Sequence, residues 1–245
     1  MRIKYDNHVV DQPFLIIGGP CAIESLDQLS QTAKAISESI DVLRGGAYKP
    51  RSKPGSFEGL KLDGLKILKH VSASLNLPTV TEVLDTRDVE LVAEYSDILQ
   101  IGSRNMQNFE LLKEAGKTKR PVLLKRGLAS TVDEWLSAAN YIQNEGNGQI
   151  ILCERGIRTF ETSTRFTLDL AGAIVAKNLS GLPVIVDPSH ATGKPELIEP
   201  ISLAAKAAGL DGIIIETHYK PDLALCDREQ AISTNHFNSI VSLLR

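Results

Sequence analysis

The sequence has few cysteines and no long apolar run, and both shortages narrow the class of protein. Its three cysteines, Cys21, Cys153 and Cys226, are odd in number and widely separated in a chain of 245 residues. This pattern suits a reducing compartment, so we expect a cytoplasmic location. No apolar run reaches the roughly 18 residues that a membrane-spanning helix needs. The first residues also lack the apolar segment of a secretory signal.

Net charge of either sign is low as well. The 27 lysines and arginines nearly balance 30 aspartates and glutamates, which gives a formal net charge of -3 at pH 7. Such a protein has no general attraction for nucleic acids or membranes. Positive charge is nevertheless concentrated in RGGAYKPRSKPGSFEGL (44–60), where four cations precede the first acid, Glu58. These cations are Arg44, Lys49, Arg51 and Lys53.

The glycine-rich nucleotide loops GxGxxG and GxxxxGK[ST] are absent, which argues against an open doubly wound sheet. The chain instead alternates short apolar runs, rich in valine and isoleucine, with amphipathic segments. Brevity, β-branching and flanking glycine or proline predict buried strands. The eight runs begin at Phe14, Val42, Leu77, Asp97, Pro121, Gln149, Pro183 and Gly212. Eight strand–helix alternations predict a single-domain (β/α)8 barrel, the TIM-barrel class of α/β fold.

Linkers, repeats and low-complexity segments are also absent. We expect residues 1–13 to form a hairpin or a cap at the bottom of the barrel. Residues 14–245 would form the catalytic barrel, with no regulatory domain. One predicted helix, DEWLSAANYIQN, places on one face Trp135, Leu136, Ala139 and Ile142. Another, NFELLKEAGK, is expected to end at Gly116, because glycine is a normal helix stop.

The active site of such a barrel lies at the carboxyl ends of its strands. Nearly every predicted strand is followed there by an ionisable residue. Six of these residues are cations: Arg44, Lys49, Arg51, Arg104, Lys125 and Arg155. The cluster repels itself unless an anion lies within it, and arginine and lysine both bind phosphate oxygens. We therefore predict a site for more than one phosphate; the alternative is a solvated charge run that pairs with surface acids.

A second set of strand-end residues carries metal-binding side chains. The set is Cys21, His190, Glu216 and Asp227. These residues follow the first, seventh and eighth strands, which are neighbours in a closed barrel, and their donor atoms suit a divalent ion. Neither CxxC nor HExxH occurs, so the alternatives stay open: a buried thiol for Cys21 and a loop-ordering hydrogen bond for His190. His218, two residues past Glu216, ranks below His190 as a ligand.

Seven segments together resemble a known enzyme family. They are GPCAIES, RGGAYKPRS, IGSRNMQNFELLKEAGK, PVLLKRG, ILCERGIRTFE, DPSHATGK and IIETHYKPDLALCDREQ. From about Phe14 to the C-terminus the chain is similar to 3-deoxy-D-arabino-heptulosonate 7-phosphate (DAHP) synthases, in the short microbial branch related to 3-deoxy-octulosonate 8-phosphate synthases. The resemblance implies a (β/α)8 barrel that condenses phosphoenolpyruvate with erythrose 4-phosphate and water. The products would be DAHP and phosphate, in the first step of the shikimate pathway to aromatic amino acids.

The resemblance also implies roles for the cations, position by position. The phosphate and carboxylate of phosphoenolpyruvate would be held by Arg104, Lys125 and Arg155, with Arg44 and Lys49 nearby. Arg51 and Ser52 would meet the phosphate of the sugar. Two phosphorylated substrates would account for the size of the cation cluster.

The family's metal ligands correspond to Cys21, His190, Glu216 and Asp227. The ion would be manganese, iron, cobalt or zinc, since this donor set accepts each of them, and it would polarise the aldehyde of the sugar. Catalysis is expected to depend on Lys49, as proton donor to the developing alkoxide, and on Cys21 and His190. Cys226 stands where serine commonly precedes the last ligand, so we expect a second thiol that makes the site prone to oxidation.

Three other functions compete with this one. The sister branch uses arabinose 5-phosphate, and its second-strand loop typically reads like K-A-N-R-S-S. The KPRS at 49–52 favours the DAHP branch, although Ser52 stands where threonine is usual. A non-catalytic barrel that senses a phosphorylated ligand, and a Schiff-base aldolase that uses Lys125, are alternatives of other classes. The joint presence of the metal set and the cations argues against both.

The resemblance bears on regulation and assembly too. Many relatives carry an extra regulatory domain, which 13 residues before the first strand cannot form. We therefore expect no direct feedback inhibition by aromatic amino acids. Relatives are usually dimers or tetramers, so the resemblance implies a homo-oligomer.

Overall fold

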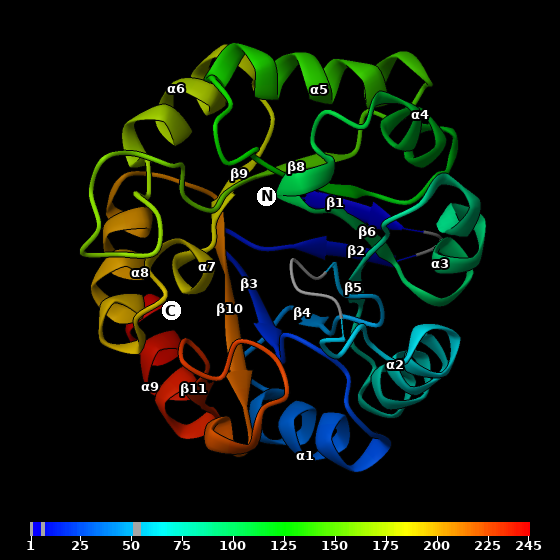
Figure 1. The fold of residues 1–245 in the computed structure, drawn as a ribbon, viewed down its shortest axis with the longest axis vertical. Helices are drawn as coiled ribbons and strands as arrows, with labels where there is room; N and C mark the ends of the chain where they lie inside the picture. Colours follow the sequence, from blue (N-terminus) through cyan, green and yellow to red (C-terminus); the bar gives the residue numbers. More distant parts are fainter. Residues whose placement is uncertain (1, 6–7, 51–54) are drawn as a thin grey trace.

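Eight parallel strands form a closed ring at the centre of the molecule (Figure 1). The computed structural model describes residues 2–5, 8–50 and 55–245. The strands of the ring are β3 (Leu15–Gly19), β4 (Val42–Arg44), β5 (Thr79–Glu82), β6 (Ile98–Ile101), β7 (Val122–Lys125), β8 (Ile150–Glu154), β9 (Val184–Val186) and β10 (Gly212–His218). Each pairs in parallel with the next along the chain, and β10 closes the ring by pairing with β3. The predicted (β/α)8 barrel is confirmed.

Helices surround this ring and alternate with its strands (Figure 1). They are α1 (Leu26–Ile36), α2 (Lys61–Leu75), α3 (Val89–Tyr95), α4 (Phe109–Lys117), α5 (Val132–Asn144), α6 (Leu170–Ser180), α7 (Pro188–Thr192), α8 (Ile198–Ala207) and α9 (Thr234–Leu244). Short elements in the loops are η1 (Thr86–Asp88), η2 (Ser103–Asn105), η3 (Pro195–Leu197), η4 (Pro221–Leu223) and β11 (Ile232–Ser233). Within the described ranges, no helix has the length and hydropathy to cross a membrane.

Alternate residues along the strands pack into two apolar layers. Leu15 and Ile17 belong to an interior layer that takes residues from all eight barrel strands, whereas Ile16 packs with residues of the helices. This follows from the two-residue period of a strand, which sends successive side chains to opposite faces. Four of the eight barrel strands end in a charged residue, namely Arg44, Glu82, Lys125 and Glu154.

The first two strands lie outside the ring. β1 (Arg2–Tyr5) and β2 (His8–Asp11) form an antiparallel hairpin. Ile3 of β1 is buried in the interior layer together with Leu15, Val42 and Ile98. These three are the first residues of their strands, so the hairpin adjoins the end of the barrel that is remote from the carboxyl ends.

A close approach between β3 and β4 requires glycine at position 19. Gly19 has a φ of +145°, a conformation that residues with a β-carbon rarely adopt. A β-carbon there would also collide with the carbonyl oxygen of Arg44. The chain just after β3 can therefore lie against the end of β4.

The predicted buried face of one helix is largely correct, and the predicted end of another is not. On α5, Trp135, Ala139 and Ile142 are buried and Leu136 is half-buried, while Ala138 also faces the core. The prediction that the other helix ends at Gly116 is wrong by one residue.

The helix continues because Gly116 has a packing role. α4 runs through Gly116 to Lys117, and a β-carbon on this glycine would lie 2.8 Å from the carbonyl oxygen of Ile142 in α5. The glycine thus permits the two helices to pack closely.

We expect Thr131→Ala to lower the free energy of unfolding by about 1 kcal/mol, the usual value of an N-cap. Thr131 accepts a hydrogen bond from the backbone of Glu134, whose side chain bonds back to Thr131. Chemical denaturation measures the change. Ser137→Ala, at an exposed position within α5, is the control, and an equal loss of stability there would show that the cap itself is not responsible.

Candidate active site

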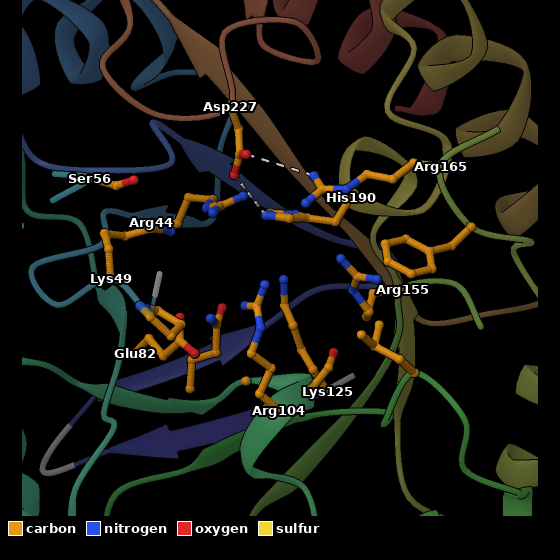
Figure 2. Close-up of a pocket in the computed structure, with 16 residues that line it drawn as sticks. Arg44, Lys49, Ser56, Glu82, Arg104, Lys125, Arg155, Arg165, His190 and Asp227 are labelled. Carbon is orange, nitrogen blue, oxygen red and sulfur yellow. Dashed lines mark ion pairs between the residues drawn. The ribbon is translucent and has the colours of Figure 1, made fainter. Parts of the chain in front are cut away.

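A cavity of about 480 Å³ lies at the carboxyl ends of the barrel strands (Figure 2). Five of the six predicted cations line it: Arg44, Lys49, Arg104, Lys125 and Arg155. The sixth, Arg51, and the neighbouring Ser52 lie outside the described residues. Arg44 and Lys125 end β4 and β7, and Arg155 directly follows β8. Strand ends that meet at one edge of the barrel thus bring distant cations together.

Two guanidinium groups in this cavity have a nitrogen without a partner. Nη1 of Arg44 and Nη1 of Arg155 are buried, and neither finds a hydrogen-bond acceptor in the part of the chain that the structure describes. An unsatisfied buried donor costs about 1–3 kcal/mol, and an anion in the cavity would remove this cost. Burial also lowers the pKa of Arg155. These donors fit a phosphate or carboxylate ligand.

The four predicted metal-binding side chains meet at this cavity, and two of them, His190 and Asp227, line it. One donor atom each from Cys21, His190, Glu216 and Asp227 lies within 4.8 Å of the others. Asp227 Oδ2 is 3.1 Å from Cys21 Sγ, and His190 Nε2 is 3.1 Å from Glu216 Oε1. Ionised carboxylates and a thiolate this close repel one another unless a cation lies between them. The donor set therefore fits a divalent ion of the manganese, iron, cobalt or zinc type.

A buried carboxylate orients the histidine of this set. Asp187 Oδ2 lies 2.7 Å from His190 Nδ1, and it also accepts a hydrogen bond from Lys125 Nζ at 2.5 Å. Burial alone would raise the pKa of Asp187, but His190 and Lys125 hold it well below its ordinary value. With Nδ1 fixed in this way, Nε2 faces the other donors, the arrangement usual for metal-binding histidines.

Neighbouring charges also determine the pKa values of His190 and Glu216. Burial lowers its pKa, but Asp187 and Glu216 outweigh this effect and raise the pKa to about 9. Glu216 in turn pairs with Arg44 at 3.1 Å. Burial would raise the pKa of Glu216, but His190 and Arg44 keep it well below the ordinary value. The carboxylate ligand is therefore ionised before any metal binds.

Lys49 lies against the thiol ligand. Its Nζ is 3.0 Å from Cys21 Sγ and 3.1 Å from the Cys21 carbonyl oxygen. Gly46 makes room for this contact, because a β-carbon there would lie 2.7 Å from Lys49 Cδ. Burial lowers the pKa of Lys49, but Cys21 and Cys226 raise it more, so the amine stays protonated.

The site contains a second thiol, Cys226, which lies close to Cys21. Cys21 Sγ lies 3.2 Å from Cys226 Sγ, and both side chains are buried. The hydrogen bond to Cys226 raises the pKa of Cys21 well above its ordinary value, and burial adds to this effect. A bound divalent ion would reverse this, because metal coordination deprotonates a thiol.

His218 lies outside the group of four donors. Its Nδ1 accepts a hydrogen bond from the Lys220 backbone, and its Nε2 is 3.9 Å from Glu24. Beyond Glu216, β10 leaves the ring and pairs with β11, so that His218 is opposite Ser233. This departure separates His218 from the mouth of the barrel.

Three residues of the site were not predicted, because the search considered only residues that follow a predicted strand. Arg165 and Phe166 line the cavity from the loop between β8 and α6, and Gln230 bonds to Glu216 from the loop after β10. Arg155 and Arg165 both lie over the Phe166 ring, at 4.4 and 5.7 Å from its centroid. None of the three immediately follows a strand of the barrel, so only the general bias of loops toward functional residues could have indicated them.

The fold and the site together are typical of a (β/α)8-barrel enzyme that binds phosphorylated substrates next to a cluster of four metal-binding side chains. Residues 6–245 match the family model described as DAHP synthetase I family. The chain belongs to this family.

Individual relatives agree with this assignment. The phospho-2-dehydro-3-deoxyheptonate aldolase of Thermotoga maritima is 49% identical over 233 residues, which cover 95% of this chain and 69% of that protein. A crystal structure of the Thermotoga maritima aldolase (DAHP synthase) superposes with a TM-score of 0.95 at 47% identity, covering 100% of this chain and 72% of that one. The 2-dehydro-3-deoxyphosphooctonate aldolase of Francisella tularensis subsp. holarctica is 31% identical over 253 residues, covering 96% of this chain and 91% of that protein.

We expect a mild oxidant to join Cys21 and Cys226 in the metal-free protein, because their sulfur atoms are in contact. Titration after denaturation should then find one thiol in place of three. A reductant should restore both thiols, and activity should return when a divalent metal is then added back. Cys226→Ser should resist inactivation, while Cys153→Ser, whose thiol lies in the barrel interior, should behave like the parent. Equal inactivation of the Cys226→Ser protein would contradict the expectation.

Proposed function

We propose that this protein condenses phosphoenolpyruvate with erythrose 4-phosphate and water, giving DAHP and phosphate as the first step of the shikimate pathway. Membership of the DAHP synthetase I family supports this activity. So does the 49% identity to a protein named phospho-2-dehydro-3-deoxyheptonate aldolase. The observation that carries the proposal is a cluster of four metal-binding donors beside a cavity in which two arginines have a nitrogen without an acceptor among the described residues.

In this proposal, phosphoenolpyruvate binds against the inner cations. Arg104, Lys125 and Arg155 would bind its phosphate and carboxylate, with Arg44 and Lys49 at one side. Nη1 of Arg155 offers an unused donor for this purpose. The pairing of Lys125 with Asp187 fixes its amine without removing its other two protons. Arg51 and Ser52 remain the proposed contacts of the sugar phosphate.

Cys21, His190, Glu216 and Asp227 would hold the metal ion, which would act as a Lewis acid toward the aldehyde oxygen of the sugar. C3 of phosphoenolpyruvate attacks the aldehyde carbon, water adds at C2, and loss of phosphate completes the reaction. Lys49 carries a proton on Nζ beside this cluster and would donate it to the developing alkoxide. Asp187 keeps His190 oriented throughout.

The proposal extends to assembly as a homo-oligomer, either a dimer or a tetramer. An exposed apolar face on α6 supports it: Val175 is 47% and Leu179 65% exposed. Faces of this kind are commonly covered in an oligomer. A molar mass from light scattering equal to that of one chain would exclude this part of the proposal.

The activity is tested by phosphate release from phosphoenolpyruvate with either erythrose 4-phosphate or arabinose 5-phosphate. We expect release with the four-carbon sugar, loss on chelation and recovery when a divalent metal is added back. Preference for arabinose 5-phosphate would place the chain with the octulosonate relatives instead. Silence with both sugars in metal-loaded protein would favour the phospho-ligand sensor.

We expect Lys49→Met to lower kcat at least about 100-fold, in the usual range for loss of a general acid. Metal content should be measured in the same sample, because Lys49 also touches Cys21. Lys66→Met, at an exposed position on α2, is the matched control and should leave kcat unchanged. If Lys49→Met retains its metal and keeps full kcat, Lys49 is not the proton donor.

A further inference from the structure

The buried side-chain amide of Gln230 connects one carboxylate ligand of the site, Glu216, to Arg165. Gln230 is 2% exposed. Its backbone N–H donates to the carbonyl oxygen of Asp227 at 3.1 Å, which closes a turn. Asp227 itself has a φ of +50°, in the left-handed region that aspartate tolerates better than most residues. The turn places the side chain of Gln230 beside the ligand on β10.

Hydrogen-bonding chemistry fixes the orientation of this amide. Gln230 Oε1 accepts from Arg165 Nη1 at 2.8 Å, and Gln230 Nε2 donates to Glu216 Oε2 at 2.5 Å. Arginine can only donate and an ionised carboxylate can only accept. The reverse orientation would therefore lose both bonds, and the amide has one arrangement.

The two oxygens of each carboxylate ligand consequently have different partners. Glu216 Oε2 bonds to Gln230, while Oε1 lies 3.1 Å from both His190 Nε2 and Arg44 Nη2. Asp227 Oδ1 lies 3.8 Å from Arg165, while Oδ2 lies 3.1 Å from Cys21 Sγ. Figure 2 shows Arg165 and Asp227 directed toward each other at the edge of the cavity. The outward oxygens meet Arg165 and Gln230, and the inward oxygens face the other donors.

Arg165 is itself anchored to the helix that carries the histidine. Its backbone N–H donates to the carbonyl oxygen of Thr192 in α7 at 2.9 Å, and α7 contains His190. Gly193, directly after α7, leaves room for the aliphatic part of the arginine side chain. The arginine and the glutamine thereby connect all three segments that supply His190, Glu216 and Asp227.

We propose that Arg165 and Gln230 are positioning residues that fix which oxygen of Glu216 and of Asp227 binds the metal. The inference rests on the proposed function, because it assumes a metal ion at the four-donor cluster. Residues that hold metal ligands in place usually contribute strongly to affinity, although they do not touch the ion. They also restrict the geometry that the ligands offer.

The test measures metal affinity and ligand geometry rather than turnover. Metal-free protein is titrated with cobalt(II) in competition with a chromophoric chelator, and the thiolate-to-cobalt absorption band is recorded. We expect Gln230→Met, which keeps the volume and loses both bonds, to weaken binding about 10- to 100-fold and to shift the band. Arg165→Gln should weaken binding by about 10-fold, and Arg165→Lys should recover part of this loss.

Arg228→Gln is the matched control. It removes the same charge from an exposed side chain next to Asp227, and its affinity should stay within about twofold of the parent if general electrostatics are not responsible. Should Gln230→Met fold poorly, the partly exposed Arg165 (39%) carries the test through its two variants.

Three results would overturn the proposal. Unchanged affinity and an unchanged band in Arg165→Gln and Gln230→Met would exclude a positioning role. A raised KM for one phosphorylated substrate, with unchanged metal affinity, would make Arg165 a substrate contact instead. If the parent protein itself takes up no cobalt at this cluster, the proposed metal site fails, and this inference fails with it.

Discussion

The pairing of β10 with β3 is the contact on which the site depends. Gly212–Glu216 lie in parallel register with Leu15–Gly19, so the last strand of the barrel completes the ring against the first. This register brings Cys21, two residues after β3, beside Glu216 on β10. Asp227, in the loop after β10, and His190, in α7 after β9, lie beside them. An open sheet with the same strands would separate Cys21 from the other three donors by the width of the whole sheet.

Buried side chains of opposite charge form ion pairs at the carboxyl ends of the barrel strands. Buried acids lie opposite buried cations: Glu216 bonds to Arg44, and Asp187 to Lys125. Each pair costs desolvation of two charges, which the interaction recovers only with good hydrogen bonds. Arg155 lacks such a pair among the residues described, and burial lowers its pKa. Arg155 therefore offers an anion in the cavity a buried donor that no described acceptor occupies.

Sequence alone predicts the parts of this protein that follow a regular rule. The strands could be found because short β-branched runs between glycine and proline have few other stable conformations. Arg44 and Lys125 could be placed at the site because they end strands of a predicted barrel.

Other residues depend on the tertiary path of a loop. Arg165 and Gln230 reach the site through a turn and a bridge to α7, and no local periodicity encodes either contact. The prediction that α4 ends at Gly116 was wrong for a related reason, because contact with α5 overrides the local preference of glycine to end a helix.

The order of the four donors along the chain has a consequence for how the protein matures. A nascent chain that has emerged as far as His190 presents a thiol and an imidazole, but neither of the carboxylates, which lie in the last strand and the loop after it. A chain is made from its amino end, so the complete donor set exists only once Asp227 has left the ribosome. Selection among the available metals is thus left to the closed barrel, and a chain that is still being synthesised offers each of them only a weaker, incomplete site.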